Sequence, residues 1–118
     1  ALERFYAEVM EFEPIGREAG RHAFFRVGRG SVLLCFDAQA AARPGGLPPH
    51  GATGPGHVAF GVRGHELDAW RERLMSLGVE IEAETTWPAG GRSLYFRDPA
   101  GNLLELLTPG LWNTPAGW

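Results

Sequence analysis

Lysine is absent from the 118-residue sequence, and cysteine occurs only once, at Cys35. All 11 basic residues are arginines, so the chain offers no side-chain amine for Schiff-base catalysis. A single cysteine allows neither an intrachain disulfide nor a thiolate zinc cluster, and we expect a reducing, cytoplasmic setting. The longest apolar run, residues 32–36, is far shorter than the roughly 20 residues that a membrane helix needs.

Positive charge is scarce and scattered. The formal net charge is −3, and no stretch of the sequence gathers its arginines into a stripe. Nucleic acids and anionic membranes are therefore not expected as partners. The first residues, ALERFYAEVM, carry neither the basic start nor the apolar segment of a signal peptide. With 44% apolar and 21% charged residues, the composition is that of a folded globular chain.

Glycine and proline are abundant, and their placement divides the chain. Nine of them fall in RPGGLPPHGATGPG at 43–56, which is typical of a connector. The two flanking stretches show the same succession of signals, which indicates an internal repeat. The predicted organisation is one structural domain in four parts: a first module at 1–38, a Gly/Pro-rich linker at 39–55, a second module at 56–109 and a C-terminal tail at 110–118.

The repeat can be aligned directly. A shift of 71 residues places GRHAFFRVGRGSVLLCF (20–36) over GRSLYFRDPAGNLLELL (91–107), with six of 17 positions identical. Upstream, a shift of 65 aligns the apolar positions of 2–12 with those of 67–77, so the second copy has six extra residues before its glycine pair. Because the two matches occur in the same order, they indicate a duplicated unit.

The second copy predicts a complete β-α-β-β-β unit. Apolar residues at steps of three and four predict a helix at 65–77, ended by Gly78. Strands are predicted at 57–62, 79–82, 92–97 and 102–107, the last two joined by a turn at 98–101. The first copy starts within its helix and lacks the first strand. By the shift of 65, that strand would begin about eight residues before Ala1, and we expect it in the natural protein.

Three strings resemble the vicinal oxygen chelate superfamily, which includes glyoxalase I, bleomycin-resistance proteins, fosfomycin-resistance thiol transferases and extradiol dioxygenases. They are GHVAFGV (56–62), LDAWRERLMSLGVEI (67–81) and, above all, RSLYFRDPAGNLLELLTP (92–109). LERFYAEVMEFE (2–13) looks like the helix entry of the first module. The resemblance implies an α+β fold of two tandem βαβββ modules, whose curled mixed sheets form a cup around a metal or ligand. It also implies a homodimer.

In that superfamily, metal ligands come from the first and last strands of each module. The matching positions here are His57 and Glu105, and the resemblance implies that they bind a divalent ion such as Mn, Fe, Ni, Zn or Co. Strand alternation places both on the face away from the apolar residues that pack on the helix. Leu34 matches Glu105 in the first module and cannot bind a metal. The alternatives are a salt bridge from Glu105 to Arg92 or Arg97, and a neutral His57 that caps its strand by hydrogen bonds.

Alternation also predicts further residues of the cup. Ser93 and Tyr95 share one strand face, and the repeat places His22 and Phe24 at equivalent positions. We expect proton transfer by Glu105 or His22. The residues expected to contact the substrate are Ser93, Tyr95, Phe24 and, from the linker, His50. The alternatives are an ordinary surface histidine for His22 and a solvated loop residue for His50.

Two functions fit this resemblance. The first is a metal-dependent enzyme of lyase, isomerase or dioxygenase type that acts on a small oxygen-chelating substrate. The second is a metal-free protein that binds a small molecule or drug in the same cup, as bleomycin-sequestering proteins do. The residue at the missing first-strand position would discriminate between them, because a His, Gln or Glu favours the enzyme and an apolar residue favours the binder.

Overall fold

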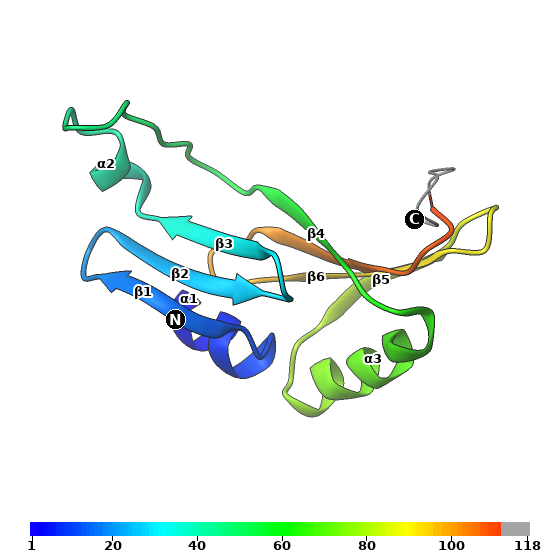
Figure 1. Ribbon diagram of the computed structural model, residues 1–118. Helices are drawn as coiled ribbons and strands as arrows, with labels where there is room; N and C mark the ends of the chain where they lie inside the picture. Colours follow the sequence, from blue (N-terminus) through cyan, green and yellow to red (C-terminus); the bar gives the residue numbers. More distant parts are fainter. Residues whose placement is uncertain (112–118) are drawn as a thin grey trace. The chain divides into compact units, whose positions relative to one another are not determined.

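The computed structural model describes residues 1–111, and the chain divides into two compact units, Ala1–Gly54 and Pro55 onward (Figure 1). The boundary lies within the predicted linker. The part of the predicted tail beyond residue 111 falls outside the described residues. Within residues 1–111, no helix has both the length and the apolar character needed to cross a membrane.

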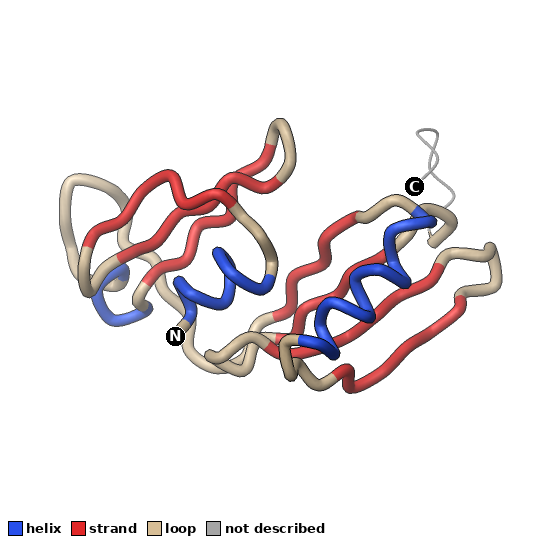
Figure 2. The backbone as a smooth tube through the Cα atoms, turned by 90° about the horizontal axis from the view of Figure 1, so that it is seen from below, coloured by secondary structure: helices blue, strands red, loops and turns tan. Residues whose placement is uncertain are grey.

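The first unit is a three-stranded antiparallel sheet with a short helix on one face (Figure 2). Its elements are α1 (Leu2–Arg4), the π-helical turn η1 (Phe5–Val9), β1 (Glu13–Glu18), β2 (His22–Val27), β3 (Ser31–Phe36) and α2 (Ala38–Ala41). Phe5, Tyr6 and Met10 are buried with Ala23 and Phe25 of β2, which form the core of this unit. The helical turn therefore buries alternate residues of β2 and leaves the other face of the strand open.

The second unit has the predicted β-α-β-β-β order. Its elements are β4 (His57–Gly61), the 3₁₀ turn η2 (Gly64–Glu66), α3 (Leu67–Ser76), β5 (Ile81–Thr86), β6 (Arg92–Arg97) and β7 (Leu103–Leu107). The strand order is β4-β7-β6-β5, in which β4 pairs parallel with β7 and the other pairs are antiparallel. Helix α3 lies across one face of this sheet (Figure 2).

The end of α3 corrects one strand boundary. Gly78 has φ 73°, the N–H of Gly78 donates to the carbonyl of Met75, and the N–H of Val79 donates to the carbonyl of Leu74. These bonds form a Schellman-type cap, so Val79 completes the helix end and does not begin a strand. The strand predicted at 79–82 therefore starts at Ile81 and continues to Thr86.

The two faces of the second sheet differ in chemistry. Leu94, Phe96, Leu104 and Leu106 are at most 1% exposed and form a core with Leu67 and Leu74 of α3, both 0% exposed. The intervening residues of β6 and β7 point to the opposite face, where polar side chains gather. The packing of α3 on one face of the second sheet thus leaves the opposite face for the polar side chains.

The duplication is visible in strand pairing. Phe24 of β2 lies opposite Leu34 of β3, and Tyr95 of β6 lies opposite Glu105 of β7, a displacement of 71 residues on both strands. The α+β fold class is confirmed, with a sheet and helix in each unit. The first sheet is antiparallel throughout, because no described residue supplies the strand equivalent to β4.

Candidate metal and catalytic site

His57 and Glu105 meet on the open face of the second sheet. In the parallel pair β4–β7, His57 lies opposite Leu103 and Ala59 lies opposite Glu105, so the two side chains are diagonal neighbours with the same orientation. The distance from His57 Nε2 to Glu105 Oε2 is 3.2 Å. Glu105 is 6% exposed, whereas the His57 side chain is about half exposed.

A backbone contact determines which ring nitrogen of His57 faces the carboxylate. Its Nδ1 lies 3.1 Å from the carbonyl oxygen of Leu103. A carbonyl oxygen only accepts hydrogen bonds, so this contact requires the proton on Nδ1. In a neutral imidazole, Nε2 is then an acceptor that faces an acceptor oxygen of Glu105. Only a cation between these two atoms, either a proton or a metal ion, makes the contact favourable. The strand-capping bond of Nδ1 is therefore compatible with the predicted ligand role of His57, because Nε2 stays available.

The other oxygen of Glu105 accepts two hydroxyl hydrogen bonds. The Ser93 hydroxyl donates to Oε1 at 2.6 Å, and the Tyr95 phenol donates to the same atom at 3.0 Å. Burial raises the pKa of Tyr95, and the hydrogen bond to Glu105 raises it further. Tyr95 is therefore a neutral donor at ordinary pH, which suits a carboxylate acceptor.

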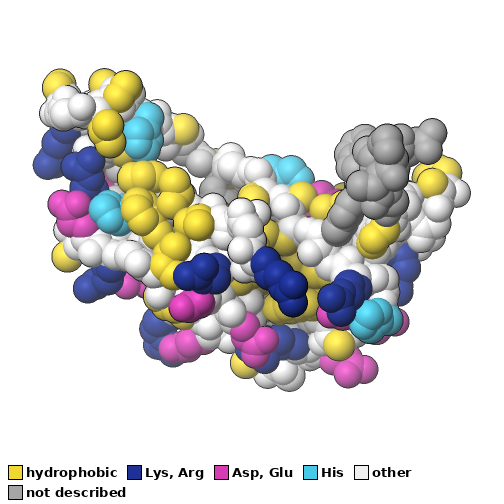
Figure 3. Space-filling model, in the orientation of Figure 1, with side chains coloured by type: hydrophobic (Ala, Val, Ile, Leu, Met, Phe, Trp, Pro, Cys, Tyr) yellow, Lys and Arg dark blue, Asp and Glu magenta, His cyan; other side chains and the backbone are white. Residues whose placement is uncertain are grey.

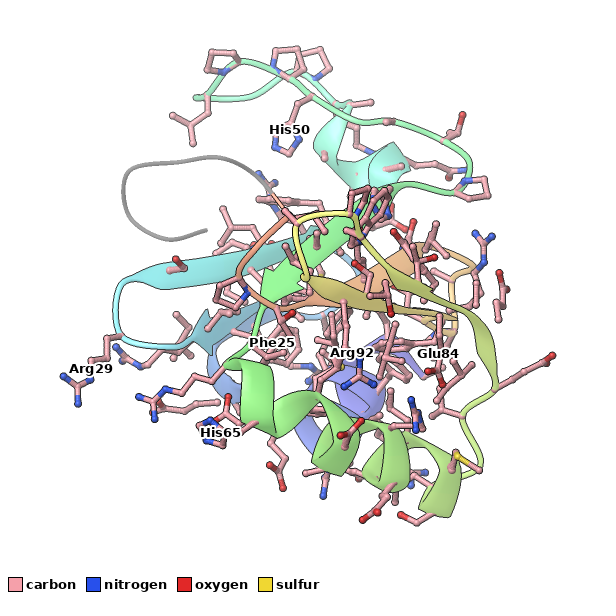
Figure 4. All side chains as sticks on the ribbon, turned by 90° about the vertical axis from the view of Figure 1, so that its right-hand side faces the viewer. Phe25, Arg29, His50, His65, Glu84 and Arg92 are labelled. Carbon is pink, nitrogen blue, oxygen red and sulfur yellow. The ribbon has the colours of Figure 1, made fainter. Side chains whose placement is uncertain are left out.

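The arginines considered as partners of Glu105 bind other carboxylates. Arg92 Nη2 donates to Asp68 Oδ1 of α3 at 2.9 Å, and Arg97 Nε donates to Glu82 Oε1 at 2.9 Å. Figure 4 shows Arg92 together with Glu84, which forms an ion pair with Arg71. The Arg92–Asp68 and Arg71–Glu84 pairs include residues of α3. Glu105 is instead contacted by two hydroxyl groups and by the His57 imidazole.

The first unit places the remaining candidates in an aromatic cluster. The rings of His22 and Phe24 stack at 4.1 Å, and Phe36 contacts both Phe24 at 5.4 Å and His50 at 4.5 Å. Among residues 1–111, His22 Nδ1 is buried with no hydrogen-bond partner, and it lies 3.7 Å from Glu18 Oε2. A groove of about 730 Å³ runs past Phe36 and His50. Figure 3 shows apolar side chains gathered on this unit next to histidine.

The described residues supply two candidate metal ligands in one place. Across residues 1–111, no group of three or more His, Cys, Asp or Glu side chains is arranged to hold a metal ion. One imidazole nitrogen and one carboxylate oxygen nevertheless suit Mn, Fe, Co, Ni or Zn, each of which accepts this mixed donor set. The pair fits such an ion, and further ligands have to come from water, substrate or groups outside this pair.

Trp87 is part of this site, although it is not among the site residues predicted from the sequence. Its indole Nε1 donates to Ser93 Oγ at 2.9 Å, so it contacts the group that binds Glu105. The available signal was the insertion in the second copy. Residues 87–91 form a five-residue connection between β5 and β6, whereas residues 19–21 form a three-residue connection between β1 and β2.

Solved structures share this fold along nearly the whole chain. A lactoylglutathione lyase from Agrobacterium tumefaciens has a TM-score of 0.91 and 38% identity, with 97% of this chain and 87% of that chain covered. A glyoxalase/bleomycin resistance protein/dioxygenase from Nocardioides has a TM-score of 0.72 and 27% identity, covering 99% of this chain and 79% of that chain.

Curated relatives match over a shorter stretch. Fosfomycin resistance protein FosX of Listeria monocytogenes is 47% identical over 51 residues, which are 42% of this chain and 38% of that protein. Metallothiol transferase FosB of Shouchella clausii is 41% identical over 58 residues, which are 44% of this chain and 37% of that protein. The match thus spans well under half the length of these relatives.

The sequence profile of one superfamily matches residues 1–106. This range contains both sheets except the last residue of β7, together with the His57–Glu105 pair and the hydroxyls that bind Glu105. The chain belongs to the Glyoxalase/Bleomycin resistance protein/Dioxygenase superfamily.

Proposed function

We propose that this protein is a divalent-metal-dependent enzyme of lyase or isomerase type that acts on a small substrate with neighbouring oxygen atoms. The observation that carries the proposal is the pair of acceptors, His57 Nε2 and Glu105 Oε2, 3.2 Å apart. With Nδ1 committed to the Leu103 carbonyl, both lone pairs are available to one cation. The similarity to a lactoylglutathione lyase along 97% of the chain supports the reaction class.

His57 and Glu105 would hold the ion, which supplies Lewis-acid polarisation of substrate oxygens when bound. The chain's own residues supply the proton chemistry. Glu105 is a carboxylate with two hydroxyl donors on Oε1, and Oε2, which faces His57, would have to leave the ion before it could accept a substrate proton. The Tyr95 side chain is half-buried, and its phenol keeps its proton at ordinary pH, so it can orient a polar substrate group beside Glu105.

The aromatic cluster of the first unit favours a second function, the binding of a small molecule without a metal. Phe36 and His50 provide ring faces along a groove of about 730 Å³, and the Phe24 ring contacts Phe36. Ring faces of this kind bind flat apolar or cationic ligands. A protein with this function would not use His57 Nε2 and Glu105 Oε2 to bind a metal ion.

Metal titration distinguishes the two functions. We expect purified, chelator-treated protein to bind Mn²⁺, Ni²⁺ or Zn²⁺, and His57→Ala and Glu105→Gln to lose this binding in calorimetric titrations. His65→Ala is the matched control, because His65 is an exposed histidine of η2 (Figure 4). Turnover of lactoylglutathione, and of fosfomycin with a thiol, would then be tested with the loaded protein. Equal metal binding by all four proteins would refute the proposed metal site.

A further inference from the structure

A chain of hydrogen bonds leads from Trp87 to Glu105. The indole Nε1 of Trp87 donates to Ser93 Oγ at 2.9 Å, and Ser93 Oγ donates to Glu105 Oε1 at 2.6 Å. The direction of both bonds is determined by chemistry, because an indole nitrogen only donates and a carboxylate oxygen only accepts. The single hydroxyl proton of Ser93 is therefore committed to Glu105, and a lone pair of the same oxygen is occupied by Trp87.

Burial makes these bonds important for the carboxylate. Ser93 is 1% exposed and Glu105 is 6% exposed, and the neighbours of Glu105 on β7 are Leu104 and Leu106. A carboxylate in such surroundings is costly unless hydrogen-bond donors compensate for the water that it has lost. Ser93 and Tyr95 both donate to Oε1, so that oxygen is satisfied within the protein and Oε2 is directed to His57.

The turn that carries Trp87 is itself held in place. The N–H of Trp87 donates to the carbonyl of Gly91 at 2.7 Å, and the N–H of Gly91 donates to the carbonyl of Gly110 at 3.3 Å. A Cβ at Gly91 would lie 2.8 Å from the carbonyl carbon of Gly110, so only glycine permits this approach. The turn at 87–91 is thus fixed at both ends and presents the indole to Ser93.

The first unit lacks every member of this chain of bonds. Under the shift of 71 residues, His22 occupies the position of Ser93, and Leu34 occupies the position of Glu105. The connection at 19–21 is shorter and contains no indole. The longer turn and its tryptophan therefore occur in the unit that has the buried carboxylate, and the unit without the carboxylate has neither.

We propose that Trp87 and Ser93 are positioning residues, which hold Glu105 with Oε1 bonded inside the protein and Oε2 turned toward His57 and its metal. This inference rests on the proposed function. It also changes the predicted role of Ser93 as a substrate contact. The Ser93 hydroxyl donates its proton to Glu105, so it cannot donate that proton to the substrate. The indole N–H of Trp87 is bonded to Ser93, so Trp87 acts on Glu105 through this serine.

The test measures metal affinity without turnover. Removal of a group that orients a metal ligand typically lowers metal affinity about 10- to 100-fold. We expect Ser93→Ala to lower the metal affinity by an amount within this range. Trp87→Phe removes the indole N–H and retains an aromatic ring, so we expect it to lower the metal affinity about tenfold. Trp70→Phe is the matched control, because Trp70 lies on α3 away from the site. Affinities for Zn²⁺ and Mn²⁺ are measured by isothermal titration, with circular dichroism to confirm folding.

A double mutant tests whether Trp87 acts through Ser93. If it does, Trp87→Phe has no further effect on metal affinity in a Ser93→Ala background, because the link is already broken. Additive losses would overturn the proposal. Unchanged affinity in both single variants, with His57→Ala still impaired, would overturn it and leave the proposed metal site intact. If Ser93→Ala does not fold, Trp87→Phe alone decides the outcome.

Failure of the proposed function is detected separately. If the wild-type protein binds no metal, the indole N–H of Trp87 is followed by NMR in the metal-free protein and assigned by its loss in Trp87→Phe. Ser93→Ala is expected to shift this signal and to accelerate its exchange with D₂O, while the Trp70 signal is unchanged. An indole signal that does not respond to Ser93→Ala would overturn the proposed chain of bonds.

Discussion

Replacement of Glu105 by glutamine tests the acceptor pair through stability alone. The substitution preserves the shape of the side chain and places an amide where the carboxylate was. Ser93 and Tyr95 can still donate to the amide oxygen, which leaves the NH₂ group directed at His57 Nε2. A contact between two acceptors thereby becomes a hydrogen bond, so we expect Glu105→Gln to be more stable than the wild type without metal at pH 8.

The magnitude follows from three contributions. Each of the two hydroxyl bonds loses about 1 kcal/mol when its acceptor becomes neutral, and the new bond to His57 returns about 1 kcal/mol. Removal of a carboxylate that is 6% exposed saves a desolvation cost of about 2–3 kcal/mol, a cautious value for a partly compensated ion. The sum is a stabilisation of about 1–2 kcal/mol.

Urea unfolding at pH 8 with a chelator present measures this difference. A variant less stable than wild type by about 2 kcal/mol at pH 8, the value for a simple loss of charged hydrogen bonds, would refute the reasoning.

Three further predictions concern the turn, the phenol and assembly. Gly101 has φ 85°, so Gly101→Val is expected to lower the free energy of unfolding by at least about 1 kcal/mol, whereas Gly30→Val at the equivalent position, where no positive φ is found, should cost less in the same urea experiment. Glu105→Gln is expected to lower the pKa of Tyr95, measured by tyrosinate absorbance with Tyr95→Phe as reference, because the carboxylate raises that pKa. Since the folded protein keeps the Tyr95 proton at a pH where the unfolded chain loses it, the stability contributed by this proton is lost as the pH rises through the folded pKa. The protein is expected to sediment as a homodimer at micromolar concentration, and a monomer would contradict this.

Alternation and repetition predicted much of the fold and the central pair of the site. His57 and Glu105 were predicted to share one face because Val58, Phe60, Leu104 and Leu106 claimed the other, and the structure places the pair 3.2 Å apart. Their role as metal ligands stays a prediction. Apolar residues at every second position of a strand predict which face is buried, and this pattern can be recognised in the sequence without the tertiary structure.

The contacts of Trp87 could not be predicted in the same way. Its hydrogen bond to Ser93 depends on the path of the turn at 87–91, which in turn depends on the close approach of Gly91 to Gly110. No periodic pattern in the sequence encodes such an approach. The predicted start of β5 was wrong for a related reason. The N–H of Val79 donates to a carbonyl of the helix cap and not to a neighbouring strand.

The two hairpins have the same strand register, so equivalent positions in the two units can be compared directly. Leu34 and Glu105 occupy equivalent register positions in the two hairpins. Leu34 lies opposite Phe24, and Glu105 lies opposite Tyr95. Whatever selection distinguishes the two positions therefore acts on side-chain surroundings and not on strand geometry. The hairpin of the first unit has an aromatic face, and the hairpin of the second unit has a buried carboxylate with its own hydroxyl donors. Exchange of these few side chains between the two hairpins would show how many substitutions separate an aromatic surface from a buried carboxylate site.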